Sequence, residues 1–359
     1  MIDLALGQVK QILERRAGAV ELLVEVGGQA ATAILYPSLL GDVETGETVV
    51  LNTTAVRLGL GTGGVHFVVA RSPDRMRLDS GHGPGHIIKQ RYTPLQHRCL
   101  SVEEADSPHR AAIEACCSLE GMPVVLAPLH SMLGPAAAGI KAAAAEACIA
   151  YVMPDCAALP IAFSRLVPAL KRAGFVDATI TTGQAFGGDL EAVNLFSGLI
   201  AARAVSRADV IIVAQGPGNV GTGTEYGFSA IAQGEWVNAV SALGGDAIAV
   251  PRLSFADQRE RHRGLSRQTV VALGVAAQVG ATIVLPELPT DQRKEIEAQV
   301  ESSGLAAKHE IVTAPGEPGL QEAERRGIEL GSMGRAPRED PVFFLAAAAA
   351  GAVAAERAK

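Results

Sequence analysis

The sequence is poor in several features that define large classes of protein. Its 359 residues include only five cysteines, with no CxxC pair: Cys99, Cys116, Cys117, Cys148 and Cys156. An odd number without paired spacing excludes a disulfide framework and a zinc-finger ligand set, and it favours a reducing, cytoplasmic compartment. Aromatic residues make up 4% of the chain, and none interleave with a lysine- and arginine-rich tract. With a net charge of −7, we therefore expect no nucleic-acid partner.

Long apolar runs and familiar catalytic motifs are also missing. The most membrane-like stretch, residues 342–355, is mostly alanine and too short to cross a bilayer, so we expect a packed helix and no membrane partner. The sequence contains no GxSxG, no HExxH and no Walker lysine-serine pair. Motifs alone therefore predict no reaction type, cofactor or metal.

The pattern of apolar residues changes near residue 100. Before it, four short β-type runs are separated by turns that contain glycine or proline, with no helix between them: residues 21–26, 29–35, 48–52 and 65–70. This pattern predicts a β-rich domain, residues 1–112, folded as a small barrel or sandwich. A glycine cluster at residues 59–64 opens no helix, and we interpret it as a bulge or hairpin loop.

Residues 113–359 have the alternating pattern of an α/β domain. Seven apolar runs separated by helical stretches are the expected strands: residues 123–127, 148–153, 178–182, 210–213, 247–250, 282–285 and 310–313. Because these runs lack strict alternation, we expect strands buried on both faces. They predict a mostly parallel sheet wrapped by helices in a Rossmann-like, three-layer arrangement.

The fourth of these runs opens into a glycine-rich loop, and residues 226–243 then have a helical pattern. Glycine lets the backbone approach a ligand closely, and the free N–H groups of a first helical turn favour an anion. The loop residues expected to bind are Gln215, Gly216, Gly218, Gly221, Thr222, Gly223 and Thr224.

A polar, arginine-rich segment follows the fifth run. Its candidate ligand-binding residues are Arg252, Arg259, Arg261, Arg263 and Ser266. Arginine suits the bidentate binding of phosphate or carboxylate. Because the carboxyl ends of parallel strands share one edge, we expect the glycine loop and this segment to face one cleft and hold a small anion. The alternative is a solvated surface loop.

Two histidines that follow strand ends are candidates for acid–base catalysis. His262 or His130 could serve as the acid or base, and Asp257 or Asp155 could orient it. A lone histidine more often completes a hydrogen-bond network, so a structural role is the competing interpretation.

A third polar stretch, residues 79–96, contains His82 and His86 followed by Lys89 and Arg91. Histidines four apart share a face only in a helix, which the intervening Gly-Pro-Gly disfavours, so we expect no metal site. Lys89 and Arg91 could approach the cleft and bind the anion. The alternative is a solvated crossover between the domains.

Several of these motifs together resemble a bacterial family catalogued only as a domain of unknown function. They occupy residues 52–64, 85–96, 215–224 and 261–266, and the similarity extends nearly end to end. The resemblance implies that both parts belong to one architectural unit. It carries no established activity, so it assigns no catalytic residue.

Three functions remain open from the sequence. The first is an enzyme that acts on a small phosphorylated or carboxylated molecule. The second is a non-catalytic binding or scaffold protein whose glycine loops serve packing. The third is an NADP-type oxidoreductase, because residues 216–221 match GxGxxG and Arg252 lies where a 2′-phosphate would bind.

Alanine- and glycine-rich residues 135–147 and the apolar C-terminal tail also predict self-association, as a dimer.

Overall fold

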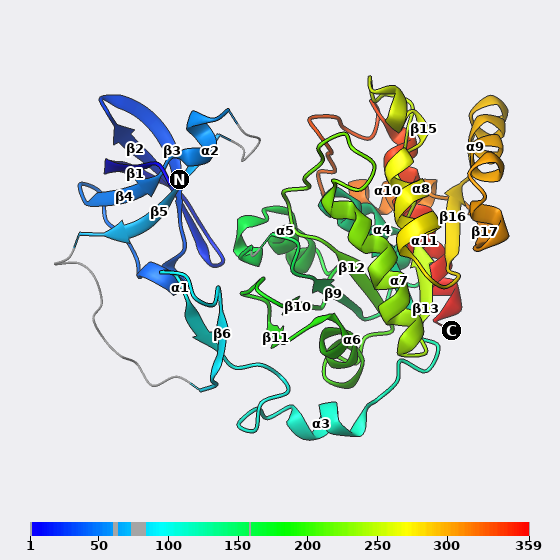
Figure 1. The fold of residues 1–359 in the computed structure, drawn as a ribbon, viewed down its shortest axis with the longest axis horizontal. Helices are drawn as coiled ribbons and strands as arrows, with labels where there is room; N and C mark the ends of the chain where they lie inside the picture. Colours follow the sequence, from blue (N-terminus) through cyan, green and yellow to red (C-terminus); the bar gives the residue numbers. More distant parts are fainter. Residues whose placement is uncertain (1, 60–63, 73–83, 158, 359) are drawn as a thin grey trace. The chain divides into compact units, whose positions relative to one another are not determined.

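The computed structural model describes residues 2–59, 64–72, 84–157 and 159–358. The chain forms two compact units, residues 1–84 with 90–97 and residues 85–89 with 98–359 (Figure 1). Each unit has a hydrophobic core of its own.

The smaller unit contains the predicted barrel, closed in the strand order β1-β2-β3-β5-β4. Its strands are β1 (Leu4–Arg16), β2 (Ala19–Val26), β3 (Gln29–Leu35), β4 (Thr48–Asn52) and β5 (Val65–Arg71). Strands β3 and β5 pair in parallel, and the other pairs are antiparallel. Two short helices, α1 (Pro37–Leu40) and α2 (Thr54–Arg57), lie between strands. The expectation of no intervening helix was therefore wrong.

Strand β1 is the longest of the barrel, and its sequence does not reveal it. Leu4 and Leu6 are exposed, whereas Gly7 lies inside beneath Leu51. A Cβ atom at Gly7 would lie 2.5 Å from Leu51 Cδ1. Because two leucines of β1 face outward and a glycine faces the core, the usual alternation of an amphipathic strand is hidden at its start.

Two of the sequence predictions lie partly outside the described residues. Positions 60–63 of the glycine cluster are not described, and neither is His82. Within the described part of the third polar stretch, β6 (Ile87–Lys89) pairs with β7 (His97–Cys99).

The larger unit contains an eight-stranded parallel sheet in the order β11-β10-β9-β12-β8-β13-β16-β17. All seven predicted strands are confirmed: β8 (Pro123–Ala127), β9 (Ile149–Met153), β10 (Ala178–Thr182), β12 (Val210–Ala214), β13 (Asp246–Ala249), β16 (Thr282–Pro286) and β17 (Glu310–Ala314). A short edge strand, β11 (Leu190–Ala192), was not predicted. Strands β8 and β12 are buried along their whole length, as expected of strands covered on both faces.

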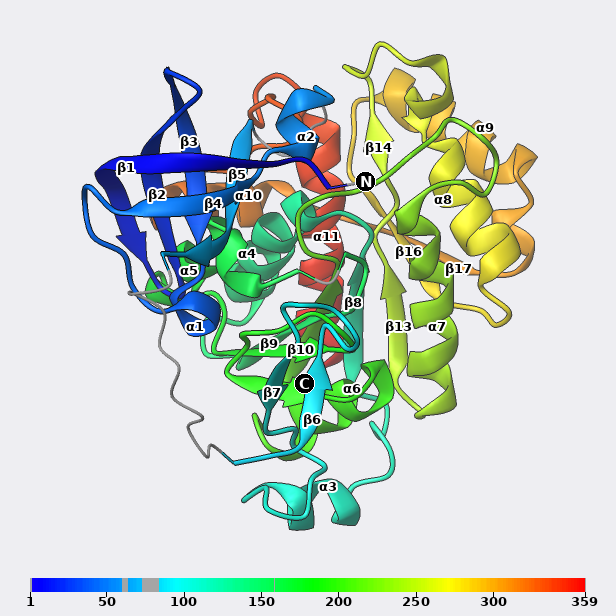
Figure 2. The ribbon, with the colours of Figure 1, turned by 60° about the vertical axis from the view of Figure 1, so that its left-hand side comes forward.

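Helices cover both faces of this sheet. The helices of the larger unit are α3 (Arg110–Ala115), α4 (Leu133–Ala143), α5 (Leu166–Arg172), α6 (Leu195–Ala204), α7 (Ala232–Ala242), α8 (Arg267–Val271), α9 (Thr290–Ser302), α10 (Glu317–Arg325) and α11 (Pro341–Arg357), of which α3 packs on α6. Helices α4, α10 and α11 pack together, and α7 packs with α6 and with a π-helical turn at Ala272–Ala276. Both α7 and α11 contact β8, from opposite sides (Figure 2). No described helix is both long and apolar enough to cross a membrane.

Strand β8 lies between β12 and β13 in the sheet. The connection that follows β8 runs in the opposite direction along the sheet to the connections that follow β12 and β13. The chain continues from β8 into α4, whereas it continues from β12 into α7 and from β13 towards α8. Such a divergence opens a crevice at the carboxyl ends of a parallel sheet. The order differs from the Rossmann order 3-2-1-4-5-6, because β12 separates β8 from β9.

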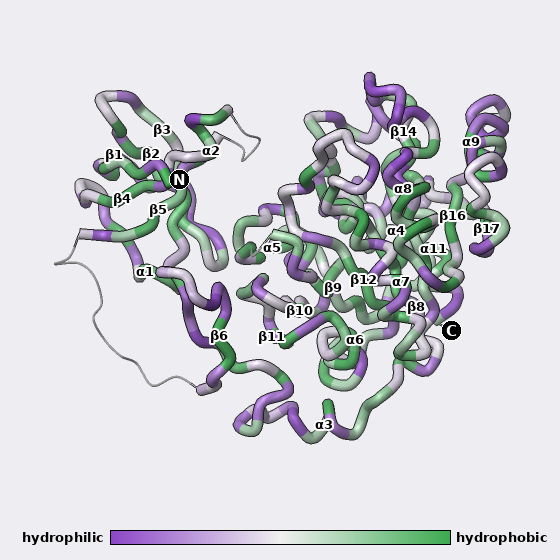
Figure 3. The backbone as a smooth tube through the Cα atoms, in the orientation of Figure 1, coloured by the Kyte–Doolittle hydropathy of each residue, from purple (hydrophilic) through white to green (hydrophobic). Residues whose placement is uncertain are grey.

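The alanine- and glycine-rich helices are internal. Gly139 of α4 lies against Ala348 O of α11, and Gly351 of α11 lies against Ala136 O of α4. Both helices are almost entirely buried within the unit, and Figure 3 shows more green, hydrophobic backbone there than in α9, which is largely purple. The packed C-terminal helix is therefore confirmed. The surfaces that motivated the prediction of a dimer are covered by this same chain, because small residues let the two helices approach closely.

This packing predicts that Gly351→Ala destabilises the protein, although alanine favours helix. The added Cβ atom would overlap Ala136 O, and relieving that overlap should lower the free energy of unfolding by about 1–3 kcal/mol. Gly274→Ala is the control, because its Cβ atom would make an ordinary 3.8 Å contact with Leu305. Urea unfolding of both variants tests this, and equal stabilities would contradict the proposed close packing.

Candidate functional site

The loops that follow β12, β8 and β13 meet around a small cavity at the carboxyl edge of the sheet. Its volume is about 10 Å³, close to the space that one water molecule needs. The lining residues are Pro128, Leu129, Ala230, Gln233, Arg252, Gln268 and Thr269. Gln233 links the strands beneath, since its Nε2 donates to Leu126 O at 2.8 Å and to Val250 O at 2.9 Å. The cavity therefore lies in the crevice that the strand order creates.

Arg252 follows β13 and is held by the start of α8. Its backbone N–H donates to Thr269 Oγ1 at 2.9 Å, and its carbonyl oxygen accepts from the N–H of Ser266 at 3.0 Å. The side chain is only 5% exposed, and Nη1 donates to Gln268 Oε1 at 2.9 Å. Because main chain and side chain are both fixed, the guanidinium has little freedom to reach solvent.

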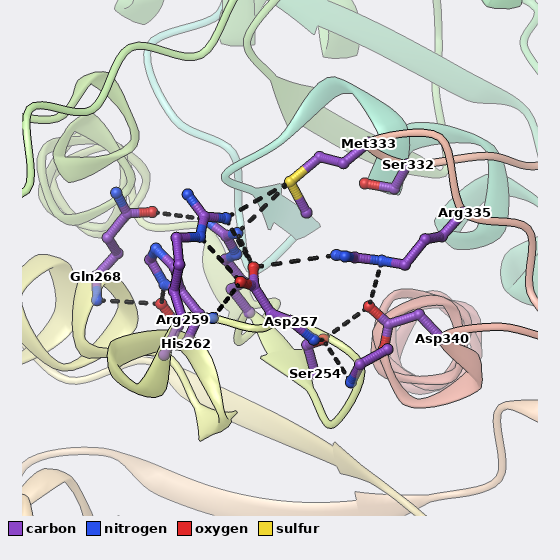
Figure 4. A network of polar contacts seen from close by, with 12 residues as sticks. Ser254, Asp257, Arg259, His262, Gln268, Ser332, Met333, Arg335 and Asp340 are labelled. Atoms are coloured by element: carbon purple, nitrogen blue, oxygen red, sulfur yellow. Dashed lines mark hydrogen bonds and ion pairs between the residues drawn. The ribbon is translucent and has the colours of Figure 1, made fainter.

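The Arg252 side chain shares the carboxylate of Asp257 with Arg259. Figure 4 shows Arg259 and Arg335 on either side of this carboxylate. Asp257 Oδ2 accepts from Arg259 Nη2 at 2.7 Å and from Arg252 Nη2 at 3.2 Å. Asp257 Oδ1 also accepts from the backbone N–H of Arg259 at 3.0 Å, which gives the local turn its shape. The hydrogen bond from Arg259 holds the pKa of Asp257 well below its usual range, so the carboxylate stays charged.

A second part of the network comes from the segment between α10 and α11. Arg335 Nη2 lies 4.0 Å from Asp257 Oδ2, and Arg335 Nε lies 3.4 Å from Asp340 Oδ2. Ser254 Oγ donates to Asp340 Oδ2 at 2.7 Å. Among the described buried atoms of this network, Arg252 Nε, Arg335 Nε, Arg335 Nη2 and Asp340 Oδ1 lack a hydrogen bond of good geometry. The network therefore joins β14 (Leu253–Ser254) to the start of α11 and leaves three donors and one acceptor unused.

The charges in this network do not balance. Three guanidinium groups, of Arg252, Arg259 and Arg335, face two carboxylates, of Asp257 and Asp340. Burial, together with repulsion by Arg259, lowers the pKa of Arg252 to about 10. Arg252 is thus still protonated at pH 7, and a positive charge in excess is held at the edge of the sheet.

His262 lies beside this network and is buried. Its Nδ1 atom lies 2.7 Å from Ser266 Oγ, the hydroxyl that also caps α8 by accepting from the N–H of Gln268. Burial and the nearby Arg252 lower the pKa of His262 to about 4. The imidazole is neutral at pH 7 and contacts a serine, while the carboxylate of Asp257 is taken by arginine. The pairing of His262 with Asp257 thus stays a prediction.

The glycine-rich loop closes mainly on itself. Thr222 N donates to Gly227 O at 2.9 Å, and the hydroxyls of Thr222 and Thr224 lie 2.9 Å apart. A 3₁₀ turn at Ser229–Ile231 precedes α7, so the glycines are not in the first turn of that helix. The expected strand, glycine turn and helix arrangement is therefore wrong in this detail. A pyrophosphate cradle at the N-terminus of α7 is not formed by these residues.

The loop nevertheless contacts the arginine segment, as the strand order requires. A Cβ atom at Gly221 would lie 3.4 Å from Gln268 Nε2, and Arg267 Nη2 lies 2.9 Å from Glu225 Oε1. Gln215, which is buried, donates from Nε2 to Pro128 O at 2.6 Å. The positive φ angles lie at Gly218 and Gly223, whereas Gly216 is packed under Leu159.

His130 lies at the end of β8 in a separate group. Its Nε2 atom lies 2.7 Å from Ser164 Oγ, and its Nδ1 atom lies 3.5 Å from Tyr151 OH. Burial lowers the pKa of His130 to about 4. Asp155 accepts from the backbone N–H of Gln184 at 2.9 Å. The described contacts thus give His130 a neutral, hydrogen-bonded role and do not join it to Asp155.

Four other candidate cations have different surroundings. Arg263 pairs with Glu295 at 3.5 Å and stacks on the ring of Phe255, and Arg261 is exposed. Lys89 is fully buried and pairs with Glu191 of β11 at 3.1 Å, at the far edge of the sheet. Lys89 therefore does not belong to the site at β8. Arg91 lies in the barrel unit and is exposed.

Sequence reasoning missed the residues that complete the network. Gln268 lies inside the arginine-rich segment but was not selected, because a neutral amide gave no signal of charge. Met333, Arg335 and Asp340 lie in a segment that follows no strand. A usable signal was the glycine pair around Met333, since closely spaced glycines mark a tight turn.

Comparison with known proteins assigns the chain to a family. Residues 32–351 match the family described as Protein of unknown function (DUF3866). The chain belongs to this family. The match includes β8, β12 and β13 and every residue of the arginine network, so the site lies within the part that defines the family. No curated protein and no solved structure matched the chain.

The low pKa values predict that acid destabilises the fold. Because the folded-state pKa of His262 is about 4 and the usual value is 6.5, the unfolded chain binds a proton first as the pH falls. The stability due to neutral His262 is complete above pH 6.5 and is lost towards pH 4. His262→Asn can still bond Ser266 but cannot titrate. Between pH 7 and 4.5 it should lose about 2 kcal/mol less stability than the wild type, measured by urea unfolding. Equal losses would contradict this environment for His262.

Proposed function

We propose that this protein binds a small oxyanion, a phosphate or a carboxylate, at the carboxyl edge of its parallel sheet. One observation carries the proposal: three guanidinium groups surround two carboxylates in a largely buried network. The crevice between diverging connections is where α/β sheets commonly bind their ligands. The proposal therefore rests on charge and on topology together.

A purely structural role accounts less well for the charge. Burying a cation costs several kcal/mol unless an anion and hydrogen bonds compensate it. In the described network, Arg252 Nε and two nitrogens of Arg335 have no well-formed hydrogen bond. An added anion would supply the missing charge and acceptors at once. Structural ion-pair networks gain most when charges match, and here they do not.

The chemistry of the site favours binding through arginine. His262, beside the network, and His130, in its separate group, are neutral at pH 7, so they can accept a proton or hydrogen bond but contribute no charge. Arg259 is the accessible donor, because its side chain is 45% exposed. Paired guanidinium N–H groups match the oxygens of phosphate and carboxylate. The proposed ligand class is accordingly a small molecule that carries one of these groups.

This proposal predicts that Arg259→Gln weakens anion binding. Loss of one charge-assisted contact should reduce affinity by about tenfold to a hundredfold. Arg325→Gln is the matched control, because Arg325 also pairs with a carboxylate, that of Glu322 at 2.6 Å, but on α10. Calorimetric titration with phosphate, sulfate and succinate measures both. If the wild type binds none of these anions, or if both variants weaken binding equally, the site is not an anion site.

The pH dependence of sulfate binding gives a second test. Sulfate does not titrate near neutral pH, and the binding cations are arginines, so its affinity should stay constant between about pH 6 and 9. Affinity should fall near pH 10, where Arg252 loses its proton. A steep fall between pH 6 and 7 would instead identify histidine as the source of charge.

A further inference from the structure

Met333 lies against both arginines that share Asp257. Its sulfur is 3.7 Å from Arg252 Nη2 and 3.8 Å from Arg259 Nη2 (Figure 4). Each Nη2 atom has two hydrogens, and each also donates to Asp257 Oδ2. The Met333 sulfur therefore accepts the remaining N–H of each Nη2 atom.

A thioether is a poor match for that position. Sulfur of methionine is a weak acceptor, whereas charged donors bind most strongly to charged oxygen. Met333 leaves the positive charge of the network unchanged. An oxygen of a phosphate, sulfate or carboxylate placed there would accept from both Nη2 atoms and neutralise charge.

The backbone that presents Met333 is strained. Its φ angle is 51°, in the left-handed region, and Gly334 follows with φ 76°. Ser332 and Arg335 exchange two backbone hydrogen bonds of 2.9 Å, which makes the segment a tight turn. Turns with two positive φ angles favour glycine, asparagine and aspartate, and a bulkier residue there costs on the order of 1 kcal/mol or more.

The Met333 side chain can leave this position without the rest of the turn. It is among the exposed large hydrophobic groups of the described chain, at 53%. The turn itself is held in place, because Arg335 pairs with Asp257 and Asp340 and Ser332 Oγ lies 3.0 Å from Ser131 Oγ. Little buried surface of its own side chain therefore holds Met333 over the arginines.

We propose that Met333 is a replaceable cover, whose sulfur occupies the position that a ligand oxygen takes between Arg252 and Arg259. Binding moves the Met333 side chain away, while Arg335 stays in the network, and exchanges two weak N–H···S contacts for charge-assisted hydrogen bonds. This inference rests on the proposed anion site and adds its location and its regulation. The free energy needed to displace the Met333 side chain lowers the apparent affinity, so the cover sets a threshold anion concentration.

A set of substitutions at position 333 tests the cover. Met333→Glu places a carboxylate beside the two arginines, and Met333→Gln is its neutral, equally sized control. We expect Met333→Glu to weaken sulfate binding at least tenfold, because the tethered carboxylate competes with sulfate. In anion-free buffer it should also raise the melting temperature relative to Met333→Gln. The rise in melting temperature separates direct pairing with arginine from general repulsion of the ligand.

Met333→Ala removes the cover without adding charge and should bind sulfate about two- to tenfold more tightly than the wild type. This variant also decides the matter if Met333→Glu fails to fold. If the wild type binds sulfate and Met333→Ala and Met333→Gln both bind it with unchanged affinity, the cover is wrong while the anion site stands. If neither the wild type nor Met333→Ala binds any tested anion, the anion site itself is wrong, and the cover with it.

Discussion

The architecture of the larger unit depends on one constraint, a parallel sheet that must be covered on both faces. Its central strands are apolar throughout, so each connection has to cross one face or the other. Helices α4 and α11 meet this need by close contact between small residues, with Gly139 and Gly351 against opposing carbonyl groups. The connection from β8 then leaves on the side opposite to those from β12 and β13. The crevice at the end of β8 follows from this coverage.

The polar groups at that crevice are organised by charge. Asp257 is the shared acceptor that holds Arg252 and Arg259 together, and Arg335 approaches from the segment before α11. A scaffold role remains the natural interpretation of several glycines, since Gly216 and Gly227 have no room for a side chain. The three guanidinium groups are different, because together they carry one positive charge more than the two carboxylates balance, and packing alone gives no reason for that excess. The two interpretations therefore apply to different residues.

Much of the fold could be predicted from the sequence, for physical reasons that also explain the misses. Strands covered on both faces appear as apolar runs, and all seven predicted runs were found as strands, including the partly exposed edge strand β17. Strand β1 escaped because Leu4 and Leu6 face outward, and the start of α7 was misplaced because a compact turn separates it from the glycines.

The site could be predicted only where its residues follow strand ends. Arg252 follows β13, and its partners Asp257 and Arg259 lie in the same short segment of sequence. Met333 and Arg335 join this network from a distant part of the sequence. Arg252 and Met333 are in contact although they lie 81 positions apart in the sequence. No local pattern encodes such a contact, because it depends on where α10 and α11 pack. The expected dimer rested on helices that this same packing buries.

The most direct test of the anion site is a crystal structure of the full chain with selenate, whose selenium can be located by anomalous scattering. The account predicts an anomalous peak within hydrogen-bonding reach of Arg252 and Arg259, with the Met333 side chain displaced. Selenate bound only elsewhere on the chain, with Met333 still in contact with both arginines at saturating anion, would contradict it.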